Sequence, residues 1–192
     1  MLGRRCSESG FYLKGLEPVR KWAELAGPFY NEILCSTLEQ APDGFISDQD
    51  VVVLGDILEH TSNPELILKR LAKLQKPETQ YLISVPNIAN IWIRINLLFG
   101  KFNYTENGIL DKTHLRFFTK STFLELLNGS GLRPMEMKYT PIPLTRLSLF
   151  FQKNWFGRFI HRGLAILTRL MPELFAYQFV GRIVTAAKEG ES

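Results

Sequence analysis

The sequence predicts an α/β protein, on three observations. Apolar runs of strand length alternate with helical patterns along its 192 residues. The composition, 45% apolar and 22% charged, is typical of a globular domain and excludes a disordered or collagen-like chain. The run DVVVL at 50–54 is apolar on both faces, which predicts a central parallel strand covered on both sides. We therefore expect a parallel or mostly parallel sheet with helices on both faces.

In the first fifty residues the pattern predicts a small strand–helix–strand unit. Pro18 suits the first position of a helix, and Gly27-Pro28 ends it. The expected elements are a strand at 11–16, a helix over 18–26, a weak strand at 32–35 and a loop over 40–49.

Further along, the strongest helix signal is Asn63 followed by Pro64 and Glu65, which is an N-cap, a proline at the first position and an acid in the first turn. Thr119 is expected to cap a second helix. The other expected elements are strands at 80–85, 132–139 and 175–185, helices over 89–99 and 145–171, and an irregular stretch over 88–118.

Several features narrow the class of protein. No apolar run reaches the ~18 residues of a membrane span, and the N-terminus lacks the apolar core of a secretory signal, so the default expectation is cytoplasm. Two cysteines suit neither a disulfide framework nor a four-ligand zinc site. The basic residues are spread out and no reading motif occurs, so no nucleic-acid partner is expected. We expect one domain over 1–192.

Polar side chains follow the predicted strands, at the edge where α/β sheets bind ligands. Glu17 follows the first strand, where a carboxylate either accepts bonds from ribose hydroxyls or begins the next helix as a solvated acid. Asp56, Glu59 and His60 follow the valine-rich strand; such a group can supply a general base, its orienting partner or metal ligands, or simply begin a helix. Their spacing alone establishes no metal site, so none is predicted.

The stretch 103–119 is both polar and aromatic. It holds Tyr104, Asp111, His114 and Arg116, a combination that favours a substrate-facing loop over a purely structural one. Asn87 follows the strand at 80–85 and is a further candidate for substrate binding.

Three segments together carry a resemblance: DVVVLGDILEHTSNPELIL at 50–68, YLISVPNIANI at 81–91 and FNYTENGILDKTHLRFFT at 102–119. They resemble the class I S-adenosylmethionine-dependent methyltransferases, within these the bacterial group related to the ubiquinone-pathway O-methyltransferases. FAYQFV at 175–180 resembles the closing strand of that family. The resemblance implies a Rossmann-like three-layer sheet, S-adenosylmethionine as cofactor, and a hydroxyl acceptor on a sugar, a lipid-linked molecule or a small molecule.

The resemblance also implies roles for individual residues. Glu17 would bind the cofactor ribose and Gly55 and Asp56 its methionine part, while Thr37 and Leu38 stand where an adenine contact is expected, with Thr37 in place of a common Asp. His60 is the first candidate for the general base and His114 the second. Asp111 or Glu59 would orient the base, and Asn87, Tyr104 and Arg116 would face the acceptor.

The front of the chain departs from the family pattern. The first strand and its glycine-rich loop have no counterpart, and residues 1–10 correspond best to the helix after that loop. We therefore expect an N-terminally truncated sheet and weak or undetectable cofactor binding. The strands ending at Glu17 and Leu54 would either pair directly or leave the sheet weakened. The alternative function is a non-catalytic methyltransferase-like remnant or interaction module.

Charge is unevenly distributed. Residues 1–111 hold 11 Lys/Arg and 14 Asp/Glu, whereas residues 112–192 hold 12 and 5, and no acid lies between Glu136 and Glu173. The basic helical segment 141–172 is expected to be a cap or appendage, and Arg158, Arg162 and Arg169 fall on one side of a helix. It is either a substrate cap or dimer surface with a solvated basic face, or a peripheral membrane contact through 145–171.

Overall fold

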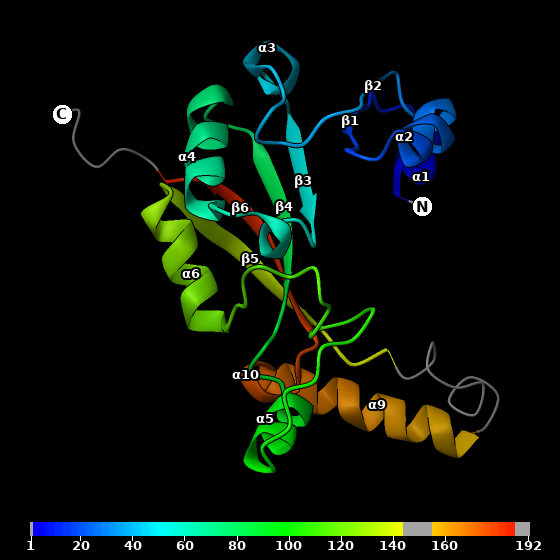
Figure 1. Ribbon diagram of the computed structural model, residues 1–192, viewed down its shortest axis with the longest axis vertical. Coiled ribbons are helices and arrows are strands. Elements are labelled where there is room, and N and C mark those ends of the chain that lie inside the picture. Colours follow the sequence, from blue (N-terminus) through cyan, green and yellow to red (C-terminus); the bar gives the residue numbers. More distant parts are fainter. Residues whose placement is uncertain (1, 144–154, 187–192) are drawn as a thin grey trace. The chain divides into compact units, whose positions relative to one another are not determined.

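The computed structural model describes residues 2–143 and 155–186, in two compact units, 1–48 and 49–192 (Figure 1). The one-domain expectation for 1–192 stays a prediction. Residues 144–154 of the predicted basic segment 141–172 lie outside the described residues.

The first unit is a small strand–helix–strand arrangement, as predicted. Strand β1 pairs in parallel with β2, with Gly15 opposite Ile33. At Gly15 a Cβ atom would lie 2.8 Å from the Tyr30 ring, so glycine is required for the close approach. The predicted loop at 40–49 contains a single helical turn. The elements are α1 Leu2–Glu8, β1 Lys14–Leu16, α2 Arg20–Ala26, η1 Gly27–Phe29, β2 Glu32–Leu34 and α3 Asp43–Ile46.

The second unit is built on a four-stranded sheet of order β3-β4-β6-β5. Strands β3 and β4 are parallel, while β6 runs antiparallel to both of its neighbours. The α/β class is confirmed, and the sheet is mixed because its closing strand β6 inserts antiparallel between β4 and β5. The elements are β3 Val51–Gly55, η2 Leu58–His60, α4 Pro64–Leu74, β4 Gln80–Pro86, α5 Ile91–Leu98, α6 Lys120–Gly129, β5 Leu132–Thr140, α9 Trp155–Leu170, α10 Pro172–Phe175 and β6 Gln178–Thr185.

Helices α4 and α6 cover one face of this sheet (Figure 1). Both begin at the predicted caps: Asn63 Oδ1 accepts from the Leu66 N–H, and Thr119 forms a capping box with Thr122. The core lies between these helices and the sheet, where apolar side chains from both are withdrawn from water. Its fully buried members include Tyr81, Ile83, Val85, Leu132, Phe179 and Ile183 on the strands and Leu68, Phe123 and Leu127 on the helices.

The prediction for the valine-rich strand is wrong in one respect. Strand β3 is an edge strand, and Val51 and Val53 are 49% and 45% exposed. Leu82, the neighbour of Val53 on β4, is also exposed, whereas Leu54 on the opposite face is buried. An apolar run alone does not reveal how many faces of a strand are covered, because that depends on elements remote in sequence.

The strands expected to end at Glu17 and Leu54 belong to different units. Strand β1 pairs with β2 in the two-stranded sheet of the first unit, and β3 pairs with β4 in the four-stranded sheet of the second. A further difference lies at the closing strand, which begins at Gln178 because residues 172–175 form the one-turn helix α10.

Candidate active site

A pocket of about 440 Å³ opens in the second unit at the carboxyl ends of β3 and β4, beside the start of β6. Its location agrees with the strand-end rule used for the sequence. Four of the predicted site residues line it: Asp56, Glu59, Asp111 and His114. The remaining lining residues are Pro86, Gly108, Thr140, Pro141, Pro143, Tyr177 and Gln178.

Asp56 is held rigidly at the end of β3. Its φ of 53° is in the left-handed region, which is uncommon for a residue other than glycine. Ser84 Oγ donates to Asp56 Oδ1 at 2.8 Å, and Gln178 Nε2 donates to Asp56 Oδ2 at 2.6 Å. These bonds tie the carboxylate to β4 and β6 and fix where its negative charge stands.

Glu59 is the deepest ionisable group of the site, with only 1% of its surface exposed. Neither of its carboxylate oxygens has a hydrogen-bond partner within the described residues. Burial raises the pKa of this carboxyl to about 8; the N–H of its own backbone, near the carboxyl but not in hydrogen-bond geometry, opposes the rise, and the charge of Asp56 adds to it. Glu59 therefore carries a proton at neutral pH in the protein by itself.

His60 and His114 form an edge-to-face pair with ring centroids 4.7 Å apart. Nδ1 of His60 lies 3.3 Å from the Thr113 carbonyl oxygen, and Nδ1 of His114 lies 3.1 Å from the Ile109 carbonyl oxygen. Because a carbonyl oxygen only accepts, each Nδ1 is the protonated nitrogen in the neutral ring. Each Nε2 then keeps a free lone pair for a proton or a ligand.

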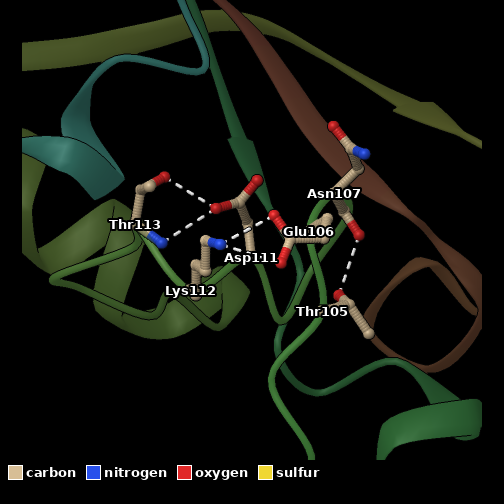
Figure 2. A network of polar contacts seen from close by, with 6 residues as sticks. All are labelled: Thr105, Glu106, Asn107, Asp111, Lys112 and Thr113. Carbon is tan, nitrogen blue, oxygen red and sulfur yellow. Dashed lines mark hydrogen bonds and ion pairs between the residues drawn. The ribbon is translucent and has the colours of Figure 1, made fainter.

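The loop that carries His114 is fixed by its own network, which Figure 2 shows around Asp111. The Thr113 hydroxyl and backbone N–H both donate to Asp111 Oδ1, at 2.7 and 2.8 Å. These bonds, the side-chain one first, lower the pKa of Asp111, and the nearby histidines add to the effect. Asp111 is thus an anion beside the histidine pair. In the same network Lys112 pairs with Glu106, and Thr105 Oγ1 donates to the Asn107 carbonyl.

Backbone bonds connect this loop to Glu59. The N–H groups of Leu115 and Arg116 both donate to the Glu59 carbonyl, at 2.7 and 3.0 Å. Below the loop, Ile93, Ile109 and Leu110 form a small buried cluster, which anchors it to α5. The close positions of Glu59, His60 and His114 are therefore set by main-chain and core contacts.

None of the three predicted acceptor residues lines the pocket, and Asn87 is the first. It is fully buried, and its amide nitrogen donates to the carbonyls of Glu173 and Ala176. Arg116 is exposed and donates to the Ser62 carbonyl at 2.6 Å. Both side chains hold segments together, so we leave them out of the proposed site. Tyr104 is exposed, packs on the edge of Phe102 and is also outside the lining.

The predicted cofactor residues fall in both units. In the first unit, Glu17 Oε1 accepts from the Val19 N–H at 2.9 Å. This bond agrees with the alternative interpretation, in which Glu17 begins the next helix. Thr37 Oγ1 accepts from the Gln40 N–H, and Leu38 follows it, half-buried, in the same segment. In the second unit, Gly55 is exposed at the end of β3, and a Cβ there would meet only Ser84 Oγ, at 4.0 Å.

Sequence reasoning missed two residues that shape the pocket. Tyr177 packs its hydroxyl against Gly108, where a Cβ atom would lie only 3.1 Å from it. Gly108 also has a φ of 101°, a conformation that favours glycine. Burial raises the pKa of Tyr177, and the charge of Asp56 adds to the rise. Gln178 holds Asp56 from β6. The only signal was the closing-strand motif at 175–180, which contains both Tyr177 and Gln178.

Comparison with known proteins identifies the fold. No protein-family model matches the chain, and no curated protein matches it. Among solved structures, it is similar to an S-adenosylmethionine-dependent methyltransferase from Archaeoglobus fulgidus, with 19% identity, 94% of this chain and 79% of that chain covered, and a TM-score of 0.59. It is also similar to a possible histamine N-methyltransferase from Thermotoga maritima, with 16% identity, 95% of this chain and 76% of that chain covered, and a TM-score of 0.59.

A third similar structure is the magnesium protoporphyrin IX methyltransferase of Synechocystis PCC 6803 with bound SAH (12% identity, 96% and 68% covered, TM-score 0.57). The chain thus has the Rossmann-like fold of S-adenosylmethionine-dependent methyltransferases. Fold by itself does not establish activity, so an activity has to be argued from the residues of the site.

Proposed function

We propose that this chain takes part in S-adenosylmethionine-dependent methyl transfer to a hydroxyl of a sugar, a lipid-linked molecule or another small acceptor. The observation that carries the proposal is the strand-end pocket, where His114 lines the wall beside the anion of Asp111. His60 lies outside the lining and reaches the site through its ring contact with His114. The fold supports the cofactor class, and the motifs at 50–68 and 102–119 support the O-methyltransferase group.

The residues at the strand ends fit the cofactor in chemical type. Gly55 leaves its backbone open to a ligand, and the Asp56 carboxylate can accept bonds beyond those from Ser84 and Gln178. In the first unit, taken by itself, Glu17 has a carboxylate of the kind that accepts bonds from hydroxyl groups. When bound, S-adenosylmethionine supplies a methyl group whose bond to sulfur breaks as the bond to the acceptor oxygen forms, leaving the electron pair on sulfur.

The chain's own residues would position the acceptor and take its proton. Nε2 of His60, or in its place that of His114, accepts the hydroxyl proton, a step that contributes about 10²–10⁴-fold to rate. Asp111 stabilises the resulting imidazolium by its charge. The pocket walls align the hydroxyl and exclude water.

The test is transfer of radiolabelled methyl from millimolar S-adenosylmethionine to a panel of sugar, lipid-linked and phenolic hydroxyls. We expect slow transfer that His60→Ala or His114→Ala lowers by about 10²-fold or more. His161→Ala is the matched control, since His161 lies on α9 outside the pocket lining. Transfer that both variants retain in full would contradict the base assignment.

The competing function, a non-catalytic remnant or interaction module, predicts no transfer to any acceptor at any cofactor concentration. Calorimetry with S-adenosylmethionine and S-adenosylhomocysteine separates cofactor binding from catalysis. Low-micromolar binding would overturn the expectation of weak affinity. A complete absence of both binding and transfer would favour the interaction module.

We infer a second property, peripheral association with an anionic lipid surface through α9. Trp155, Phe159 and Ile166 are exposed and fall within about 40° of one another on the helix. Arg158, Arg162 and Arg169 line the adjacent side, while Gly157 and Thr168 are buried on the opposite side. An exposed aromatic stripe flanked by arginines is the pattern of an interfacial helix. Within the described residues no helix is long and apolar enough to cross a membrane.

Vesicle flotation tests this property. We expect salt-sensitive flotation with phosphatidylserine vesicles and loss of it in Phe159→Ser, with vesicles of neutral phosphatidylcholine as the matched control. A concentration-dependent dimer without flotation would instead support the cap or dimer-surface interpretation of α9.

A further inference from the structure

Three potential metal ligands converge beside the strand-end pocket. One ligand atom from each of Glu59, His60 and His114 lies within 4.8 Å of the other two. Two imidazoles and one carboxylate form a donor set that suits zinc and other first-row divalent ions. The distance needed between ligands in a tetrahedral site is about 3.4 Å for bonds of about 2.1 Å, so small side-chain rotations close the gap.

The burial of Glu59 points to a ligand that the chain itself does not supply. The side chain is 1% exposed, and both of its carboxylate oxygens lack a hydrogen-bond partner within the described residues. Buried polar atoms without a partner are rare, and each calls for an explanation such as a bound ion. The nearby groups able to share a cation with this carboxylate are the two histidines.

Both histidines are held in the form that binds a metal ion. Each Nδ1 faces a backbone carbonyl oxygen, that of Thr113 for His60 and that of Ile109 for His114. Metal-binding histidines are oriented in this way, because the bond from Nδ1 fixes the ring and leaves the Nε2 lone pair for the ion.

The backbone brings the ligands together before any ion arrives. Glu59 and His60 are consecutive in η2, and the Glu59 carbonyl accepts the two N–H groups that come directly after His114. A site fixed by main-chain bonds loses little conformational entropy when it binds an ion.

We propose that Glu59, His60 and His114 bind one divalent transition-metal ion, of the Zn²⁺ type, at the wall of the strand-end pocket. Three protein ligands leave at least one coordination position open, as in catalytic zinc sites. Glu59 and His114 line the pocket, so an acceptor oxygen can reach that position.

One consequence rests on the proposed function. A hydroxyl bound to the ion would release its proton to solvent more readily, because a divalent cation lowers the pKa of a bound oxygen, and the bound oxygen would then be the nucleophile. The two imidazoles would then act as ligands, and the ion would replace them as the group that activates the hydroxyl.

The experiment is calorimetric titration of the full chain, free of any histidine tag and stripped with chelator, with ZnCl₂ and separately with CoCl₂. We expect about one equivalent bound, with visible Co²⁺ absorption bands typical of nitrogen and oxygen ligands. His60→Ala and Glu59→Gln should each weaken binding by about 100-fold or more.

His161→Ala is the matched control and should bind like the unchanged chain. His60 is exposed and Glu59→Gln preserves shape, and circular dichroism checks that both variants fold. The proposal is overturned if the unchanged chain binds neither ion, if both variants keep its affinity, or if His161→Ala weakens binding equally. If the chain transfers methyl groups but binds neither ion, the metal site is overturned and the proposed function stands. If it binds the ion but transfers methyl to no acceptor, the proposed function is contradicted and the metal site stands.

Discussion

Glu59→Gln in the metal-free chain should change how stability depends on pH. Burial holds the pKa of Glu59 at about 8 in the folded state, against 4.5 for an unperturbed carboxyl. The folded state binds the Glu59 proton more tightly than the unfolded state does, so proton binding stabilises the fold. This stabilisation is fully present below about pH 4.5 and is lost as pH rises through 8. Glutamine stays neutral throughout and shows no such loss.

The magnitude comes from the pKa difference of about 3.5 pH units. At about 1.4 kcal/mol per unit, ionisation of Glu59 in the folded state costs up to roughly 5 kcal/mol of unfolding free energy. Side-chain rotation or water entry would reduce the cost, so about 2–5 kcal/mol is expected. That is a large part of the stability of a typical domain.

Urea unfolding with chelator at pH 5, 7 and 9 measures the effect. The quantity to compare is the free energy of unfolding of the variant minus that of the unchanged chain, since other titrating groups cancel. It should rise by about 2–4 kcal/mol from pH 5 to pH 9, since part of the effect is already lost at pH 5. Glu65→Gln is the control, because Glu65 is half-exposed in an ion pair with Lys69. A difference that stays constant within about 0.5 kcal/mol would refute the reasoning.

Three further outcomes are expected in urea unfolding. Asn63→Ala should destabilise by about 1 kcal/mol, because the α4 cap bond to the Leu66 N–H is lost; an unchanged midpoint would count against the cap. Phe123→Ala should cost about 3–5 kcal/mol because its ring is fully buried, while the exposed Phe159→Ala should cost little; equal effects would contradict the placement of the core. Gln178→Ala should cost about 1–3 kcal/mol, because the Asp56 carboxylate loses a charged hydrogen bond; no change at pH 7 would show that the bond contributes nothing.

Much of the fold is encoded in local patterns. The caps at Asn63 and Thr119 begin helices α4 and α6 as predicted, because a cap side chain bonds to N–H groups only three residues away. The strands at 80–85 and 132–139 are found almost at their predicted bounds. The strand-end rule also selected Asp56 and Glu59, which line the pocket: Asp56 directly follows β3, and Glu59 comes three residues later in η2.

The features that local patterns left open depend on contacts between remote segments. The exposure of Val51 and Val53 results from the edge position of β3, and the antiparallel insertion of β6 from its pairing with β4. Asn87 was predicted to bind the acceptor because it comes after a strand. Its amide nitrogen instead donates to the carbonyls of Glu173 in α10 and of Ala176 directly after that helix.

The sequence by itself determined the alternation of strands and helices, the helix starts and the edge of the sheet where a site belongs, because each is encoded within a few neighbouring residues. Only the tertiary structure decided that His114, carried by a loop far along the chain, stands against His60 and the buried carboxylate of Glu59. The close positions of these three side chains depend on main-chain hydrogen bonds and core packing between segments that are remote in sequence. No local spacing specifies those contacts.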